Sequence, residues 1–313
     1  MGDRLKGKNA IVTGAGRGIF REVALALAAE GVRVVVVDPG VGRGGEGSEV
    51  APADEVVKEI KSKGGEAIPS YESVAEFDAA EKIIKTCVDT YGRLDILING
   101  AGVLRERMIY NMTEDDWDTV IKVHLNGTFN MCRHASGLMK EQKYGRIVTC
   151  TSDAYRWGSV GQANYAAAKG GIVSFTRAIA RELGRYGITC NVIAPMAATR
   201  MTLNEGVIAG MKKRLDAGLI TKQQYDDLIK MPGPQFVPPI VVYLVTDEAA
   251  NINGQVFGAG GGRIARYSWP EEITGIYKDH EKEGPWRLED IIRLAPSTLL
   301  TGYVNPAPPV PDK

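Results

Sequence analysis

Cysteines, long apolar runs and an excess of charge of either sign are scarce in this sequence, and each scarcity excludes a class of protein. Lys and Arg total 38 and Asp and Glu total 38, so nucleic acid and anionic membranes are not expected as main partners. No apolar run reaches the roughly 20 residues that span a bilayer, and we expect no signal peptide before the first apolar stretch. The four cysteines lie far apart, without metal-ligand spacing, at positions Cys87, Cys132, Cys150 and Cys190. We therefore expect a cytoplasmic globular protein with buried, reduced thiols and no metal site.

Short apolar strands alternate with helical patterns along most of the chain. Apolar runs rich in β-branched residues occupy residues 9–13, 32–37, 94–98, 146–149, 189–193 and 255–258. Helical patterns fill the intervals at residues 21–31, 52–63, 77–91, 113–140, 163–186 and 238–246. Continuously apolar strands are typical of a parallel sheet with helices on both faces. The alternation predicts an α/β fold with a Rossmann-type doubly wound parallel sheet, whose nucleotide site lies at the carboxyl ends of the strands.

The stretch from Thr149 to Lys169 carries the strongest catalytic pattern. Ser152 follows an apolar run, and Tyr165 and Lys169 stand four residues apart in the helical pattern after it. That spacing places an ammonium beside a phenol on one helix face. A free tyrosine is a poor acid or base at neutral pH, and a neighbouring positive charge favours its phenolate. We expect Ser152 to hydrogen-bond a substrate oxygen that Tyr165 protonates or deprotonates.

A glycine loop at residues 13–18 follows the first strand and opens the first helix. In that setting backbone N–H groups and the helix N-terminus face an anion, so we predict that Gly14 and Gly18 bind a pyrophosphate. Asp38 ends the second strand, where a carboxylate accepts hydrogen bonds from ribose hydroxyls and repels a 2′-phosphate. Arg17 acts in the opposite direction if it pairs with that phosphate, and the alternative for Arg17 is a solvated loop residue. We give Asp38 the greater weight and predict NAD.

A second glycine cluster, at residues 40–47, lacks the setting of a phosphate loop. No strand leads into it and no helix opens directly after it, so we interpret it as a flexible loop without a role in binding the pyrophosphate. Its Arg43 is a candidate contact for the adenosine end of the cofactor or for a substrate phosphate.

Together these motifs resemble the short-chain dehydrogenase/reductase family. The resemblance covers residues 5 to about 262 and rests on TGAGRG at 13–18, NGAG at 99–102, HLNGTF at 124–129, and the set Ser152, Tyr165 and Lys169. A closer resemblance is to the 3-hydroxyacyl-CoA dehydrogenase domain of peroxisomal-type multifunctional enzymes and their stand-alone bacterial relatives. It rests on the glycine-rich insert after Asp38, on KYGRIV, GQANYAAAKGG and IAPMAATRMT, and on the ending GAGGGRIARYSWPEE.

The resemblance implies a role for each matching residue. Tyr165 would be the general acid and base, Lys169 its partner and a contact of the nicotinamide ribose, and Ser152 the residue that orients the substrate carbonyl. Asn126 would hold the water that relays protons from Lys169; the alternative for Asn126 is a polar residue that distorts its helix. The cofactor-binding residues implied by the family pattern are Gly14, Arg17, Gly18, Ile19, Asp38, Ser73, Val74, Asn99, Ala101, Tyr165, Lys169 and Thr199.

Three positions depart from the family pattern. Phe20 occupies the place of the third loop glycine, which lets the first helix pack closely beneath the dinucleotide. Gly100 replaces the second Asn of the usual NNAG, and Met196 replaces a glycine after Pro195. Of the three, we expect only Phe20 to threaten cofactor binding.

The last part of the chain contains the segments expected to contact the substrate and partner subunits. We expect residues 1–262 to form the dehydrogenase domain, including a substrate lid at about 196–235. Residues 263–313 form a proline-rich C-terminal extension, which we interpret as an arm on the body or on a neighbouring subunit.

The expected function is that of an NAD-dependent oxidoreductase acting on a secondary alcohol, with a 3-hydroxyacyl-CoA thioester as substrate. A steroid or another bulky secondary alcohol is the rival substrate, because nothing in the lid identifies CoA. A non-catalytic subunit that partners an active dehydrogenase is the alternative from another class, with Phe20 as its sign. We expect a homo-oligomer, either a dimer or a tetramer, and leave open a second related subunit.

Overall fold

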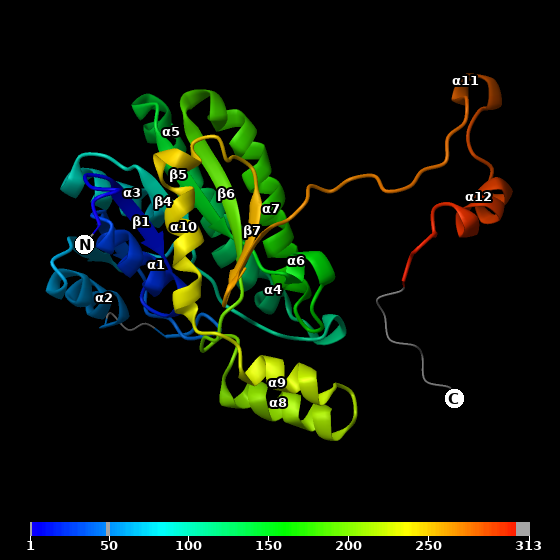
Figure 1. Ribbon diagram of the computed structural model, residues 1–313, viewed down its shortest axis with the longest axis horizontal. Coiled ribbons are helices and arrows are strands. Elements are labelled where there is room, and N and C mark those ends of the chain that lie inside the picture. The colour runs from blue at the N-terminus through cyan, green and yellow to red at the C-terminus, as the bar shows by residue number, and fades with distance from the viewer. Residues whose placement is uncertain (1, 48–50, 305–313) are drawn as a thin grey trace. The chain divides into compact units, whose positions relative to one another are not determined.

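An eight-stranded sheet forms the centre of the computed structural model, which describes residues 2–47 and 51–304 (Figure 1). The strands are β1 (Asn9–Thr13), β2 (Arg33–Val37), β3 (Ala67–Ser70), β4 (Ile96–Asn99), β5 (Gly145–Cys150), β6 (Ile188–Pro195), β7 (Val256–Gly260) and β8 (Arg263–Arg266). Their order across the sheet is β3-β2-β1-β4-β5-β6-β7-β8, and all neighbours are parallel except β7 and β8. The predicted doubly wound α/β fold is confirmed.

Helices cover both faces of this sheet. The α-helices before β7 are α1 (Gly18–Ala29), α2 (Ala51–Ser62), α3 (Phe77–Tyr91), α4 (Glu114–Ile121), α5 (Gly127–Gln142), α6 (Ala154–Trp157), α7 (Ala163–Leu183), α8 (Glu205–Asp216), α9 (Lys222–Ile229) and α10 (Pro238–Leu244). One core layer joins α1, α2 and α10 to the sheet, and the other joins α3, α5 and α7 to it. Helices α8 and α9 have no buried residue and belong to neither core layer. None of the helices in the described ranges is long and apolar enough to cross a membrane.

Strand residues alternate between the two core layers, as the pleat of a strand requires. In β2, Val34 and Val36 pack in the layer of α1, whereas Val35 and Val37 pack in the layer of α3. Because both faces are buried, most positions of such a strand are apolar. This explains why the central strands could be recognised as continuous apolar runs. The four cysteines are buried thiols, as expected.

The strand order reverses direction at the centre of the sheet. β1 pairs with β2 on one side and with β4 on the other, with Val12 opposite both Val36 and Ile98. The chain after β1 therefore continues toward one edge of the sheet, through β2 and β3, whereas the chain after β4 continues toward the other edge, through β5. A crevice forms at such a switch point, outside the carboxyl ends of the strands, and it is the usual ligand site of this architecture.

Two strands and one helix interruption were missed by the sequence analysis. β3 is a short edge strand that contains Pro69, and β8 is an antiparallel edge strand with mostly exposed residues, so neither has a continuous apolar run. The single helix expected at residues 113–140 is interrupted by a π-helical turn, Lys122–Asn126, between α4 and α5. Because β8 pairs with β7, the first compact unit continues past residue 262 and ends at Tyr267.

The second unit begins at Ser268 and contains two short helices, α11 (His280–Glu283) and α12 (Leu288–Leu294). Neither helix has a buried residue. Within this unit, Thr274 Oγ1 donates a hydrogen bond to Thr298 O. The end of the proline-rich tail, after residue 304, lies outside the described residues. Docking of this segment on the body or on a neighbouring subunit stays a prediction.

Replacing Ile11 with alanine tests the placement of the core. Ile11 lies in β1 at the centre of the sheet and is 0% exposed. We expect Ile11→Ala to lower the free energy of unfolding by about 2–5 kcal/mol, because buried surface is lost and a cavity remains. Ile273→Ala removes the same atoms from a side chain that is 91% exposed, and we expect a change below about 0.5 kcal/mol. Urea denaturation measures both, and equal effects would contradict this assignment of the core.

Candidate active site

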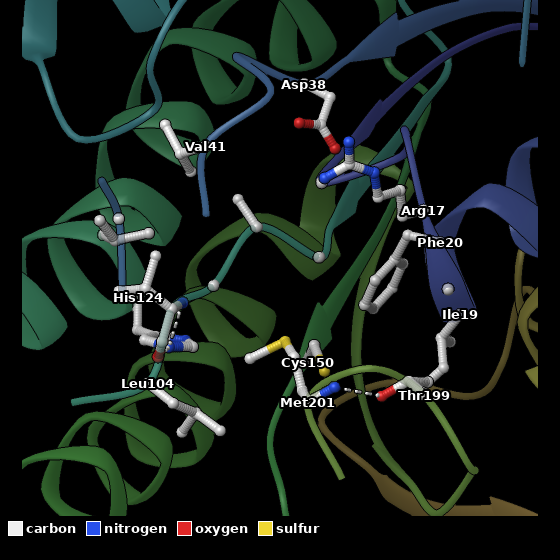
Figure 2. A pocket seen from close by; sticks show the side chains of 18 of the residues that line it. Arg17, Ile19, Phe20, Asp38, Val41, Leu104, His124, Cys150, Thr199 and Met201 are labelled. Atoms are coloured by element: carbon white, nitrogen blue, oxygen red, sulfur yellow. Dashed lines mark hydrogen bonds between the residues drawn. The ribbon is translucent and has the colours of Figure 1, made fainter. Parts of the chain in front are cut away.

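A pocket of about 520 Å³ opens at the carboxyl ends of the central strands. Residues that follow β1, β2, β4, β5 and β6 line it, together with residues of α7 (Figure 2). Its volume lies in the range of small-molecule sites in proteins. The pocket therefore occupies the position that the strand order assigns to a ligand.

Most of the predicted site residues line this one pocket. Those that do are Gly14, Arg17, Gly18, Ile19, Asp38, Ser73, Val74, Ala101, Ser152, Tyr165, Lys169 and Thr199. Asn99 and Asn126 do not. The side chain of Asn99 is buried and its Nδ2 donates to the Sγ of Cys132, 3.4 Å away. Asn99 thus faces the core beside α5, and its neighbour Gly100 lines the pocket instead.

The glycine loop leaves the N-terminus of α1 open. Among the described residues no side chain caps this helix, and its first turn contains no acidic residue. Gly14 has a φ of 67°, and a Cβ on it would lie 2.9 Å from the backbone of Ala101, so only glycine lets the loops after β1 and β4 touch. Thr13 Oγ1 accepts hydrogen bonds from the backbone N of Gly100 at 3.0 Å and of Ala101 at 3.2 Å. An open helix N-terminus held in this way is a suitable anion site.

Asp38 follows β2 and faces the glycine loop. Its Oδ2 accepts a hydrogen bond from Gly16 N at 2.8 Å, and its Oδ1 accepts one from Gly40 N at 2.8 Å. Each carboxylate oxygen has two lone pairs, so acceptor capacity is left for hydroxyl groups of a ligand. Figure 2 shows Arg17 at the same end of the pocket. A carboxylate and a guanidinium therefore both face this region.

Ser152, Tyr165 and Lys169 form a second group in the pocket. Lys169 is 3% exposed, and its Nζ donates to Cys150 O at 2.8 Å. The same Nζ lies 5.4 Å from the centre of the Tyr165 ring. Ser152, just after β5, is partly exposed to the pocket. A hydroxyl, a phenol and a buried ammonium in one pocket can bind an alcohol or carbonyl oxygen and exchange a proton with it.

Asn164 positions Tyr165, a role that the sequence motifs did not predict. Its side chain is buried at the start of α7, where Nδ2 donates to Arg105 O at 3.0 Å and to Asp116 O at 2.8 Å. Its Oδ1 accepts a hydrogen bond from Tyr165 N at 2.8 Å. The first turn of α7 is thereby tied to α4 and to the chain that follows β4. The signal in the sequence was its place directly before Tyr165 in GQANYAAAK.

His124, not Asn126, reaches the pocket from the HLNGTF segment. Asn126 is exposed, at the end of the π-helical turn, and does not line the pocket. His124 is 2% exposed and its ring packs edge-on against Tyr165, with 5.2 Å between ring centres. Its Nε2 lies 2.8 Å from Val103 O and 3.1 Å from Val103 N, so it donates or accepts according to the tautomer. The helix distortion considered for Asn126 is present as a π-helical turn, and His124 is the buried residue of that turn.

The second glycine cluster also contributes to the pocket, which corrects our interpretation of it. Val41, Gly42 and Gly45 line the cavity. Arg43 does not line it; instead Arg43 Nη2 pairs with Glu106 Oε2 at 2.6 Å. The cluster is a loop, as predicted, but hydrogen bonds to distant segments hold it over the cavity, as between Leu104 N and Arg43 O at 2.9 Å.

Similarity to known proteins agrees with this geometry. The family model described as short chain dehydrogenase matches residues 8–206. The chain is 39% identical over 282 residues to a peroxisomal hydratase-dehydrogenase-epimerase of Neurospora crassa, covering 90% of this chain and 29% of that protein. It is 39% identical over 297 residues to a hydroxyacyl-CoA dehydrogenase of Mycobacterium tuberculosis, covering 92% of this chain and 88% of that protein.

A solved structure extends the comparison to three dimensions. The crystal structure of a short chain dehydrogenase from Mycobacterium avium has a TM-score of 0.78 and 39% sequence identity, and covers 98% of each chain. The chain thus matches that protein over nearly its whole length, whereas it spans less than a third of the peroxisomal relative.

The acid stability of the protein tests the burial of His124. Burial, with a further contribution from the positive charge of Lys169, lowers the pKa of His124 to about 3. An exposed histidine titrates near ~6.5, so between these values the unfolded chain binds more protons and stability falls as the pH falls. Relative to His124→Gln, we expect the wild type to lose up to about 1.4 kcal/mol of unfolding free energy per pH unit below pH ~6.

Urea denaturation at several pH values between 7 and 5 measures this slope. Gln keeps a polar group that can reach the backbone of Val103 but does not titrate. His134→Gln is the matched control, because His134 bonds to Phe77 O on the surface and should leave the slope unchanged. Parallel slopes for wild type and His124→Gln would contradict a buried, neutral His124.

Proposed function

The chain belongs to the short-chain dehydrogenase family, and from this premise we propose that it transfers a hydride between NAD and the secondary alcohol carbon of a 3-hydroxyacyl-CoA thioester. One observation carries the proposal. A single pocket contains the glycine loop, the Asp38 carboxylate and the group of Ser152, Tyr165 and Lys169. The resemblance predicted from the sequence motifs is confirmed at the level of the family and of its relatives.

A nicotinamide dinucleotide fits the residues present. The open N-terminus of α1 suits the pyrophosphate, and the oxygens of Asp38 have acceptor capacity for the adenosine ribose. We propose NAD because the negative charge of Asp38 repels a 2′-phosphate. Arg17 is the feature that favours NADP, because it lies at the same end of the pocket.

The proton chemistry belongs to the second group of residues. When bound, the nicotinamide ring supplies the acceptor or donor of the hydride. In the oxidation direction Tyr165 would take the proton of the substrate hydroxyl, and in reduction it would return a proton to the oxygen. Ser152 would hold that oxygen, while Lys169 keeps a positive charge beside the phenol. Because Asn126 is exposed outside the pocket, we no longer assign it the role of holding a relay water.

The substrate class is proposed from relatives and from the lid. The relative of similar length is named a hydroxyacyl-CoA dehydrogenase, and the multifunctional relative includes a dehydrogenase in its name. The lid region contains α8 and α9, neither of which has a buried residue, so it can adapt to a bulky substrate. The same openness would suit a steroid, which stays the rival substrate.

Compartment and assembly are proposals of the same kind. We propose the cytoplasm, because buried thiols at all four cysteines suit a reducing compartment. We also propose a homo-oligomer, a dimer or a tetramer, with the C-terminal extension as a candidate contact between subunits.

Tyr165→Phe tests the catalytic assignment. The change removes one hydroxyl and leaves the ring that packs against His124. We expect turnover of NAD with a 3-hydroxyacyl-CoA to fall by at least about 10²-fold, because the proton acceptor is lost. Thermal unfolding should stay at the wild-type value, and the Kd for NADH should change far less than turnover. Tyr110→Phe, at an exposed tyrosine, is the control.

Any of three results would count against the proposal. Wild-type turnover in Tyr165→Phe would contradict the role of Tyr165 as general acid and base, and absence of turnover in the wild type itself would favour a non-catalytic subunit. Turnover of a hydroxysteroid but of no acyl-CoA would keep the chemistry and replace the substrate.

A fluorescence titration with NADH and NADPH tests the role of Asp38. We expect the wild type to bind NADH in preference to NADPH. Asp38→Asn removes the charge that repels the 2′-phosphate, so the ratio of the two dissociation constants should shift toward NADPH by about tenfold or more. Asp89→Ala, at an exposed carboxylate on α3, should leave the ratio unchanged. Preference for NADPH by the wild type would show that Arg17 outweighs Asp38.

A further inference from the structure

The side chain of Phe20 occupies the space that a side chain at Gly100 would need. A Cβ built on Gly100 would lie 2.2 Å from Cγ of Phe20, and 2.3 Å and 2.5 Å from Cδ2 and Cδ1. These distances are far below ordinary van der Waals contact. Phe20 lies in the first turn of α1 and Gly100 directly follows β4, so the contact joins the two halves of the sheet at its switch point.

The ring of Phe20 has little freedom to avoid such a clash. Its Cγ lies on the axis of χ2, so turning the ring about that bond leaves the closest contact unchanged. A change of χ1 would remove the ring from the core cluster that it shares with Val23 and Leu27, where it is 7% exposed. Relief would therefore require a shift of α1 itself.

Gly100 is held just as firmly on the other side. Its backbone N–H and that of Ala101 both bond to Thr13 Oγ1, which ties this loop to β1. Gly100 is not among the glycines with a positive φ, so its backbone conformation is open to any L-amino acid. Glycine is therefore required at this position for space rather than for conformation.

Both residues also line the pocket. Figure 2 shows the ring of Phe20 directed into the cavity, on the side where Arg17, Ile19 and Thr199 lie. A ring that is packed on the core side and open on the pocket side forms a rigid piece of wall. This wall stands next to the glycine loop, where the dinucleotide is proposed to bind.

We propose that Phe20 and Gly100 form an interlocked pair, in which Phe20 is a cofactor-contacting residue and Gly100 is the glycine that admits its ring. The part of this proposal that concerns the cofactor rests on the proposed dinucleotide function. The two departures from the family pattern, Phe20 and Gly100, then compensate each other: the volume added by the ring on α1 is removed from the loop after β4. The ring supplies the dinucleotide with an apolar contact in place of backbone, and α1 keeps its distance from the loop after β4.

A double-mutant cycle tests the pair. Its variants are Phe20→Ala, Gly100→Ala and the double variant, and its readouts are the Kd for NADH and thermal unfolding. Phe20→Ala removes all three clashing atoms and keeps a good helix former. In the wild-type background we expect Gly100→Ala to raise the Kd by about tenfold or more and to lower the unfolding temperature. In the Phe20→Ala background the same substitution should change the Kd by less than about threefold.

The control for added volume is Gly137→Ala. Gly137 lies on the exposed side of α5, and a Cβ there meets nothing within 4 Å, so neither readout should change. If Gly100→Ala alone fails to fold, recovery of folded protein in the double variant supports the pair. An equal cost of Gly100→Ala in both backgrounds would overturn it.

Two further outcomes separate this inference from the proposed function. If the wild type binds NADH and Phe20→Ala binds it within about threefold, the ring is not a contact of the cofactor and that half of the proposal is wrong. If the wild type binds neither NADH nor NADPH, the proposed function fails. The unfolding data still decide whether Phe20 and Gly100 interlock, because that readout needs no nucleotide.

Discussion

The pairing of β1 with β4 is the constraint on which the site depends. It places the chain after β1 against the chain after β4, and three features make this contact close: the glycine at position 14, the hydrogen bonds to Thr13 Oγ1 and the packing of Phe20 on Gly100. Because the strands are parallel, their carboxyl ends meet at one edge of the sheet. The residues proposed to bind the cofactor, after β1 and β2, and those proposed to handle the proton, after β5, therefore reach the same cavity, although they are far apart in the sequence.

Much of the fold could be predicted because a parallel sheet that is covered on both faces requires continuous apolar strands. The central strands met that requirement, and the βαβ alternation predicted the doubly wound sheet, whereas the order of its strands comes from the structure. The edge strands did not meet the requirement, since β3 contains Pro69 and β8 is mostly exposed, and neither has to be apolar to pair with its neighbour. The π-helical turn between α4 and α5 was missed for a related reason. The spacing of apolar residues indicates which face of a helix is buried. A π-helical turn inserts one residue and rotates that face, but the apolar pattern continues through it without interruption.

The site residues that could be predicted from the sequence are those defined by local sequence information, whereas those defined by long-range contacts could not. The glycine loop, Asp38, Ser152, Tyr165 and Lys169 are defined by their position relative to a strand end or by spacing on one helix, and all of them line the pocket. His124 and the loop at 40–47 depend on contacts across the fold. Only the structure shows that His124 meets the backbone of Val103 and the ring of Tyr165, and that Arg43 reaches Glu106. Asn126 was assigned from the resemblance of HLNGTF to the family pattern, but in the π-helical turn there His124 lines the pocket and Asn126 is exposed.

When a larger residue replaces a glycine of a family motif, its effect on cofactor binding depends on the residue that it packs against. Considered alone, Phe20 threatens cofactor binding, because a large ring stands where a small residue lets the helix approach. The facing position determines the outcome. With a side chain at residue 100, the ring would force α1 away from the loop after β4; with Gly100, that space is open and the ring fills it. An aromatic residue in a glycine loop is thus weak evidence for a decayed site when the opposing residue has lost its side chain. The intact group of Ser152, Tyr165 and Lys169 in the same cavity is consistent with that argument.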